Sequence, residues 1–160
     1  MILIAVILVG LFAGTVLLGA PYVPTRQKDI ETALDLLDLQ PGQTLVELGS
    51  GDGRLLAAAG KRDLRAVGYE VNPLLALVSV VRTWRLRNLI KIHLANYKLA
   101  RWPDHIDGLY IFGSKREMRF IAKKIAALPK PITLVSYGFK LPGHEATNAV
   151  GPFYSYQIDK

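Results

Sequence analysis

The chain has 160 residues, which suits one domain, and 51% of its residues are hydrophobic while 21% are charged. Those proportions exclude a disordered tail, and the absence of cysteine excludes a disulfide framework, a thiolate metal site and a cysteine nucleophile. The formal net charge is +7, from 20 lysines and arginines against 13 acidic residues.

The amino-terminal segment contains no charged side chain before Arg26. A helix over residues 1–20 would rise about 30 Å, the thickness of the hydrocarbon layer of a bilayer. The alternative is a cleaved signal peptide, but Pro21 directly after Gly19 and Ala20 makes a poor cleavage site. We therefore expect a single transmembrane anchor over residues 1–20.

The basic residues predict the orientation of this anchor. All lysines and arginines follow it, so the positive-inside tendency places the carboxyl-terminal part in the cytoplasm or an equivalent inner compartment. Pro21 and Pro24 predict a stiff linker over residues 21–27, which leaves residues 28–160 as the folded domain.

The rest of the chain alternates apolar runs with helical patterns. The spacing of its apolar residues predicts helices over 30–37, 53–60, 73–87 and 118–128. Apolar runs predict strands over 44–49, 65–71, 89–95, 107–112, 131–138, 145–150 and 153–158. This alternation predicts an α/β protein with a mainly parallel sheet, helices on both faces, and the last two strands as an antiparallel hairpin at its edge.

Two predicted strands end in residues suited to binding a ligand. The first is followed by Gly49, Gly51 and Gly53, which allow a sharp turn and a close approach of the backbone to a ligand. The second ends at Glu70, whose carboxylate can accept hydrogen bonds from both hydroxyls of a ribose. Because ligands bind at the carboxyl ends of strands in open α/β sheets, we expect both segments to line one site.

The details of the glycine loop favour a cationic ligand over a dinucleotide. Its spacing is GxGxG rather than GxGxxG, and Arg54 stands where the dinucleotide fingerprint has its third glycine. Glu47 would bring negative charge to the loop, which is unfavourable beside a diphosphate and favourable beside an ammonium or sulfonium group. S-adenosylmethionine carries both groups and a ribose; a dinucleotide site and a purely structural glycine turn remain the alternatives.

The segment Glu47–Arg54 stands beside further informative segments: Pro21–Thr25, Gly68–Pro73, Arg82, Trp84 and Leu141–Gly143. Together they resemble a family of small membrane-anchored lysine methyltransferases, whose mitochondrial members methylate the adenine nucleotide translocase and the c subunit of ATP synthase. The resemblance implies a Rossmann-like class I methyltransferase fold and S-adenosylmethionine as the cofactor.

The resemblance also implies roles for individual residues. Glu47 and Gly49 would hold the amino acid end of the cofactor, and Glu70 its ribose. The cofactor-binding set that we expect from it is Glu47, Gly49, Ser50, Gly51, Gly53, Glu70, Val71, Asn72 and Asn96. Asn96 stands where such enzymes usually present an aspartate to the adenine amino group, and its amide oxygen can accept the same hydrogen bond.

The sequence says less about how the methyl acceptor binds than about how the cofactor binds. Tyr22, Thr25 and Tyr97 are candidates for covering or shaping the acceptor channel, with ordinary packing as the alternative, and no catalytic base is identified. We expect the acceptor to be a lysine of a membrane or membrane-associated protein. The alternatives are methylation of a lipid or small hydrophobic molecule, and an inactive cofactor-binding scaffold.

Other partners are disfavoured. Nucleic acid is not expected, because no aromatic stacking platform is evident and no Asn-Pro-Pro-Tyr motif follows the fourth strand. The three histidines lack ligand spacing, so no metal is expected. Two basic groups suit either anionic headgroups or plain solvation: Arg82, Arg85, Arg87 and Lys91, and then Lys115, Arg116, Arg119, Lys123 and Lys124.

Overall fold

The computed structural model describes residues 26–159. The predicted anchor and most of the predicted linker, including Tyr22 and Thr25, lie outside the described residues. Within residues 26–159, no helix combines the length and the apolar character that crossing a membrane requires.

The described chain alternates strands and helices. The helices are α2 (Gln27–Leu37), α3 (Arg54–Lys61), α4 (Pro73–Thr83) and α5 (Lys115–Ile125), with a short 3₁₀ helix, η1 (Trp84–Leu86), after α4. The strands are β1 (Thr44–Leu48), β2 (Arg65–Glu70), β3 (Ile90–Leu94), β4 (Gly108–Phe112), β5 (Ile132–Tyr137), β6 (Asn148–Val150) and β7 (Phe153–Ile158).

The strands form one seven-stranded sheet in the order β3-β2-β1-β4-β5-β7-β6. The five strands from β3 to β5 pair in parallel, and β7 runs antiparallel between β5 and β6. This arrangement confirms the predicted parallel sheet with an antiparallel hairpin at its edge. The strand order reverses at β1, which lies between β2 and β4, and this switch point is where open α/β sheets bind ligands.

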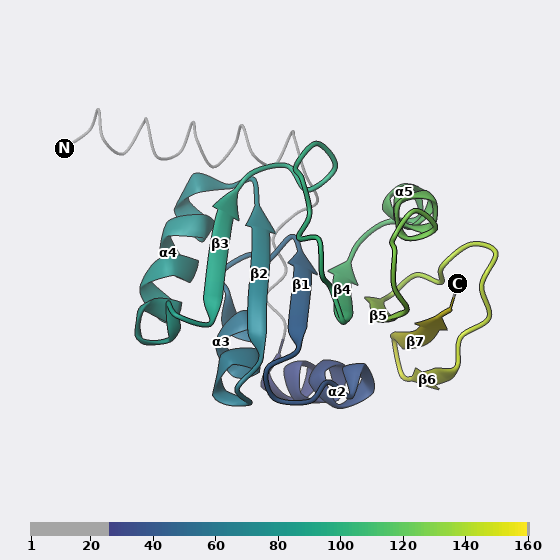
Figure 1. Ribbon diagram of the computed structural model, residues 1–160, viewed down its shortest axis with the longest axis horizontal. Coiled ribbons are helices and arrows are strands. Elements are labelled where there is room, and N and C mark those ends of the chain that lie inside the picture. The colour runs from purple at the N-terminus through teal and green to yellow at the C-terminus, as the bar shows by residue number, and fades with distance from the viewer. Residues whose placement is uncertain (1–25, 160) are drawn as a thin grey trace.

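Helices cover both faces of the sheet, as the alternation predicted (Figure 1). The apolar stripe of α2 packs with α3 against one face, in a core that includes Leu34, Leu45 and Leu56. The opposite face carries a second core, in which α5 contributes Met118, Ile121 and Ile125.

The connection between β3 and β4, residues 95–107, is the longest segment without a helix or strand within residues 26–159. It consists of turns, bends and irregular backbone with no helix, and Trp102 and Ile106 anchor it to the same core as α5. The Trp102 indole Nε1 donates a hydrogen bond to the Tyr97 carbonyl at 2.8 Å.

Two predicted elements are at least three residues shorter than expected. The helix predicted over 73–87 ends at Thr83, whose hydroxyl bonds the Ser79 carbonyl at 2.8 Å, and continues as η1. The strand predicted over 145–150 begins only at Asn148, because three residues pair with β7.

Candidate active site

The loop after β1 turns sharply at the switch point of the sheet. Gly49, Gly51 and Gly53 all have positive φ angles, of 83°, 53° and 73°, a conformation that favours glycine. The amides of Gly49 and Ser50 both donate to the Tyr69 carbonyl at 2.9 Å. These bonds hold the loop against the end of β2.

The Glu70 carboxylate joins the two loops that the sequence assigned to one site. Its Oε2 accepts a hydrogen bond from the Gly51 amide at 2.8 Å, and its Oε1 accepts one from the Asn72 amide at 2.8 Å. The side chain is buried. Each carboxylate oxygen has a second lone pair, so the carboxylate is oriented by the backbone and can still accept ligand hydroxyls.

Glu47 is a buried acid on β1. Its Oε2 has no hydrogen-bond partner among the described residues. Burial raises the pKa of Glu47, and the negative charges of Asp52 and Glu70 raise the pKa further. A cation placed beside this carboxyl group would favour its ionised form and offset part of the burial cost.

An ion-pair network that the sequence reasoning missed braces the same loop. Arg82 donates from Nε to the Asp52 carbonyl and from its terminal nitrogen to Asp52 Oδ2, both at 2.9 Å. Arg54 also pairs with Asp52 Oδ2, at 2.8 Å. Arg82 therefore ties α4 to the glycine loop.

Ser79 explains why the loop needs glycine at one position. A Cβ atom on Gly53 would lie 2.0 Å from Ser79 Oγ and 2.8 Å from Ser79 Cβ. Ser50 Oγ lies similarly close to the position of a Cβ on Gly68, at 2.7 Å. Both serine hydroxyls are buried and lack a hydrogen-bond partner in the described part of the chain.

The remaining predicted cofactor residues lie at the ends of β2 and β3. Val71 is half-buried, and buried Asn72 caps α4 by accepting hydrogen bonds from the amides of Leu74 and Leu75 at 2.9 and 3.3 Å. Asn96 follows β3 and is exposed; its Oδ1 accepts a hydrogen bond from the Lys98 amide at 3.0 Å. The structure thus brings the set from Glu47 to Asn72 together, with Asn96 one strand further along the sheet.

Tyr97, the one acceptor-side candidate within the described residues, belongs to a polar cluster. Its hydroxyl donates to Glu117 Oε1 at 3.0 Å, and Lys98 Nζ lies 3.4 Å from the same oxygen. Burial raises the pKa of Tyr97, and the adjacent Glu117 raises it further. The phenol is therefore a hydrogen-bond donor and not a base.

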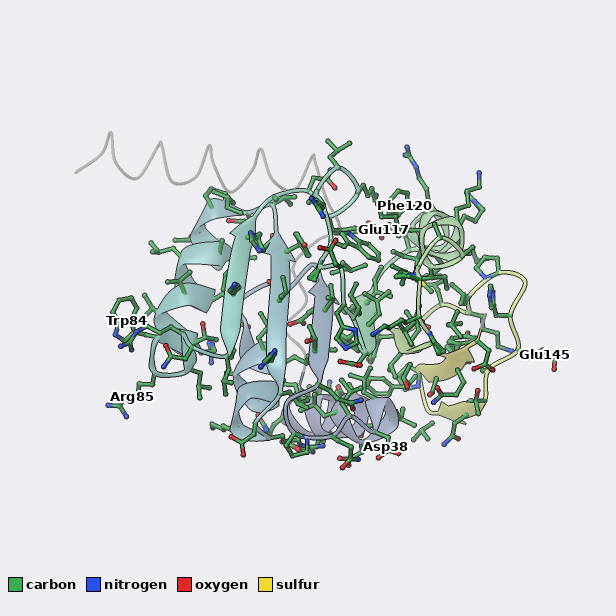
Figure 2. All side chains as sticks on the ribbon, in the orientation of Figure 1. Asp38, Trp84, Arg85, Glu117, Phe120 and Glu145 are labelled. Atoms are coloured by element: carbon green, nitrogen blue, oxygen red, sulfur yellow. The ribbon has the colours of Figure 1, made fainter. Side chains whose placement is uncertain are left out.

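Glu117 holds this cluster at the start of α5. Burial alone would raise the pKa of Glu117, but hydrogen bonds from Ser114 and Tyr97 and the charge of Lys98 lower the pKa overall. Figure 2 shows Glu117 one turn before Phe120 on α5, and the Phe120 and Tyr97 rings are 6.3 Å apart. A Ser-x-x-Glu pattern at Ser114 was the sequence signal that could have located this capping glutamate.

In residues 26–159, no three side chains of the histidine, aspartate or glutamate type are grouped in a way that could hold a metal ion.

Two named lysine methyltransferases are similar to this chain in sequence. The lysine N-methyltransferase of Homo sapiens that is named for the c subunit of ATP synthase is 36% identical over 107 residues, which are 66% of this chain and 45% of that protein. The adenine nucleotide translocase lysine N-methyltransferase of Mus musculus is 32% identical over 139 residues, 84% of this chain and 59% of that protein. The chain is a homologue of these lysine N-methyltransferases. It spans about half the length of the curated relatives it matches, and no protein-family model matches it.

Solved structures identify the fold. An RNA methyltransferase from Salinibacter ruber, in complex with S-adenosyl-L-homocysteine, aligns with a TM-score of 0.79 at 21% identity, over 86% of this chain and 95% of that one. A SAM-dependent methyltransferase from Thiobacillus denitrificans aligns with a TM-score of 0.61 at 20% identity, over 77% of this chain and 54% of that one. The fold is that of the class I methyltransferases, with a seven-stranded mixed sheet.

Proposed function

We propose that this protein is an S-adenosylmethionine-dependent protein-lysine N-methyltransferase. The observation that carries the proposal is that the two lysine methyltransferases described above are 36% and 32% identical to it. The arrangement of Glu70, Glu47 and the glycine loop at the switch point of the sheet supports it.

The residues present fit this cofactor. Glu70 has a carboxylate fixed by two amides and suited to ribose hydroxyls, and Gly49 leaves open space where a Cβ would stand. The buried Glu47 oxygen without a partner among the described residues suits a positively charged amino acid end. When bound, S-adenosylmethionine supplies the methyl group as a sulfonium, whose sulfur leaves as a neutral thioether.

The chain's own contribution to catalysis is binding and positioning. Methyl transfer to lysine needs a neutral amine aligned behind the methyl carbon at about 3 Å. The ammonium proton must therefore leave before transfer, and desolvation lowers the pKa of an amine. Tyr97 and Glu117 form the polar wall on the α5 side of the acceptor channel in this proposal, while Tyr22 and Thr25 contribute from the segment before α2.

We place the substrate in a membrane. The uncharged residues 1–20 support a single-pass anchor, and the basic residues after them support a catalytic domain on the cytoplasmic or equivalent inner side. The named substrates of the relatives are a translocase and a component of ATP synthase, which supports a lysine of a membrane or membrane-associated protein as the acceptor. The two alternative functions are methylation of a lipid or small hydrophobic molecule, and an inactive cofactor-binding scaffold.

The first test is calorimetric titration of the full-length protein in nanodiscs with S-adenosylmethionine and with NAD. We expect binding of S-adenosylmethionine only. Glu70→Ala should weaken it by at least about tenfold, because two hydrogen bonds to a charged acceptor are worth at least about 1.5 kcal/mol. Glu145→Ala is the control, since Glu145 is exposed on the loop before β6, far from the site (Figure 2).

The second test follows the methyl group. Membranes incubated with the enzyme and methyl-labelled S-adenosylmethionine should carry the label in methylated lysine after protein hydrolysis. Label in the lipid extract would replace the protein acceptor by a lipid. Cofactor binding without any labelled product would indicate the scaffold, and a folded protein that binds no S-adenosylmethionine would refute the proposal.

A further inference from the structure

The outer surface of α4 is apolar and exposed. Six large apolar side chains of α4 and η1 face outward, with exposed fractions between 37% and 69%: Leu74, Leu77, Val78, Val80, Val81 and Trp84. The opposite side of the helix is buried through Ala76, Ser79 and Thr83. A helix that is apolar all round normally has both sides covered, so this surface has a partner in the working protein.

The α4 surface offers that partner almost no hydrogen bonds. The Ser79 and Thr83 hydroxyls are buried, and the guanidinium of Arg82 is turned onto Asp52. Protein interfaces of ordinary size carry about one hydrogen bond per 100–200 Å². A lipid layer requires none, so the composition of this surface favours lipid over a protein partner.

Basic and aromatic residues gather at one end of the α4 surface. Trp84 and Arg85 both project outward where α4 ends (Figure 2). The Arg87 guanidinium lies 5.2 Å from the centre of the Trp84 ring, so a second arginine stands at this end of the surface. Tryptophan and arginine beside an apolar surface are the residues that settle at the boundary between headgroups and acyl chains.

We propose that the α4 surface, Leu74 to Trp84, rests in the interface of an anionic bilayer, with Arg85 and Arg87 on the lipid phosphates. This contact is separate from the anchor predicted over residues 1–20 and does not depend on methyl transfer. Its effect is orientation, because α4 begins three residues after Glu70 and is tied to the glycine loop through Arg82 and Asp52. A domain held at α4 would keep the cofactor site at a fixed height above the membrane.

The two tryptophans permit a direct test on the full-length protein. Trp102 is buried, so Trp102→Phe leaves Trp84 as the single tryptophan reporter. The protein is reconstituted into phosphatidylcholine–phosphatidylglycerol vesicles with and without bromine on the acyl chains. We expect Trp84 to emit at shorter wavelength than a tryptophan exposed to water, to lose most of its intensity to brominated lipid, and to be protected from acrylamide.

Two other results would overturn the proposal. Emission quenched by acrylamide and not by bromine would leave Trp84 in water, and protection from both quenchers would place a protein surface over α4, from this chain or another. If Trp102→Phe fails to fold, the bromine quenching of Trp84 is obtained instead as the difference in quenching between the unaltered protein and Trp84→Phe.

A matched pair of variants distinguishes lipid contact through the α4 surface from nonspecific adsorption through any exposed apolar side chain. Leu77 and Val81 are 60% and 69% exposed, and Leu99, in the turn after β3, is 87% exposed, so their replacement by serine leaves the cores intact. Leu77→Ser with Val81→Ser should abolish bromine quenching of Trp84, whereas Leu99→Ser should leave it unchanged. Equal quenching in both variants would contradict the assignment of α4.

Discussion

Gly53 shows how a single atom decides the shape of the candidate site. Gly53→Ala and Gly138→Ala both force a side chain to positive φ, at 73° and 84°, which costs about 1–2 kcal/mol. Only Gly53 also meets Ser79, whereas a Cβ on Gly138 has nothing within 4 Å. We expect Gly53→Ala to lower the free energy of unfolding by clearly more than Gly138→Ala in denaturant titrations. Equal losses would show that the contact with Ser79 imposes no constraint.

Glu47 should make the stability of the ligand-free protein depend on pH. Burial, with Asp52 and Glu70 nearby, raises the pKa of Glu47 in the folded state. The protonated form then stabilises the fold fully below the pKa of an unfolded glutamate, and this stability is lost as pH rises through the folded pKa. We expect the free energy of unfolding to fall over that interval, and Glu47→Gln to reduce the fall.

The control for this measurement is Glu145→Gln, which changes an exposed glutamate and should keep the pH dependence of the unaltered protein. A Glu47→Gln protein with an unchanged pH profile would remove Glu47 as its source.

For single residues, the sequence predicts which ones lie at the ends of strands better than it predicts which side chains pair with each other. Glu70 and the glycine loop meet because the ends of parallel neighbours share one edge of a sheet. The pairing of Arg82 with Asp52 joins residues 30 positions apart. No local pattern specifies it, because a long flexible side chain can reach many partners.

The start of α5 is fixed by a reciprocal cap. Ser114 Oγ accepts from the Glu117 amide at 3.4 Å, and Glu117 Oε2 accepts from the Ser114 amide at 2.7 Å. Ser114→Ala should cost about 1 kcal/mol of stability, and Ser114→Thr only part of that, because threonine also caps helices. Chemical denaturation of the three proteins measures both values. A threonine variant as unstable as the alanine variant would argue against the cap.

The periodicity of apolar residues predicts the order and type of the helices and strands, but not the residues at which they end. Every predicted helix and strand after residue 26 has a counterpart in the structure. The helix from Pro73 was expected to reach Arg87, since the apolar pattern continues through Trp84 and Leu86, but the chain tightens into η1 there. Such an end depends on where the following strand must start, which is a tertiary constraint.

Cofactor binding should stabilise the whole domain. A ligand at 100 times its dissociation constant adds about 2.7 kcal/mol, which for a chain of this size raises the melting temperature by roughly 5 to 10 °C. We expect this shift with S-adenosylhomocysteine in thermal unfolding of the full-length protein, and none with NAD. Glu70→Ala should show at most about half of this shift at the same concentration, because a ligand at 10 times its dissociation constant adds only about 1.4 kcal/mol. A full shift in that variant would place the ligand elsewhere.

The turn-rich connection between β3 and β4 has a consequence for the choice of acceptor. Between the end of β3 and the start of β4, residues 95–107 provide turns held by Trp102 and Ile106 and no helical wall. Under the proposed lysine methyltransferase function, an acceptor protein would supply that wall from its own structure, around the lysine that is modified. A free lysine or a short unstructured peptide lacks those parts, so selectivity in this protein would come from the shape of an assembled target rather than from a sequence motif around the modified residue.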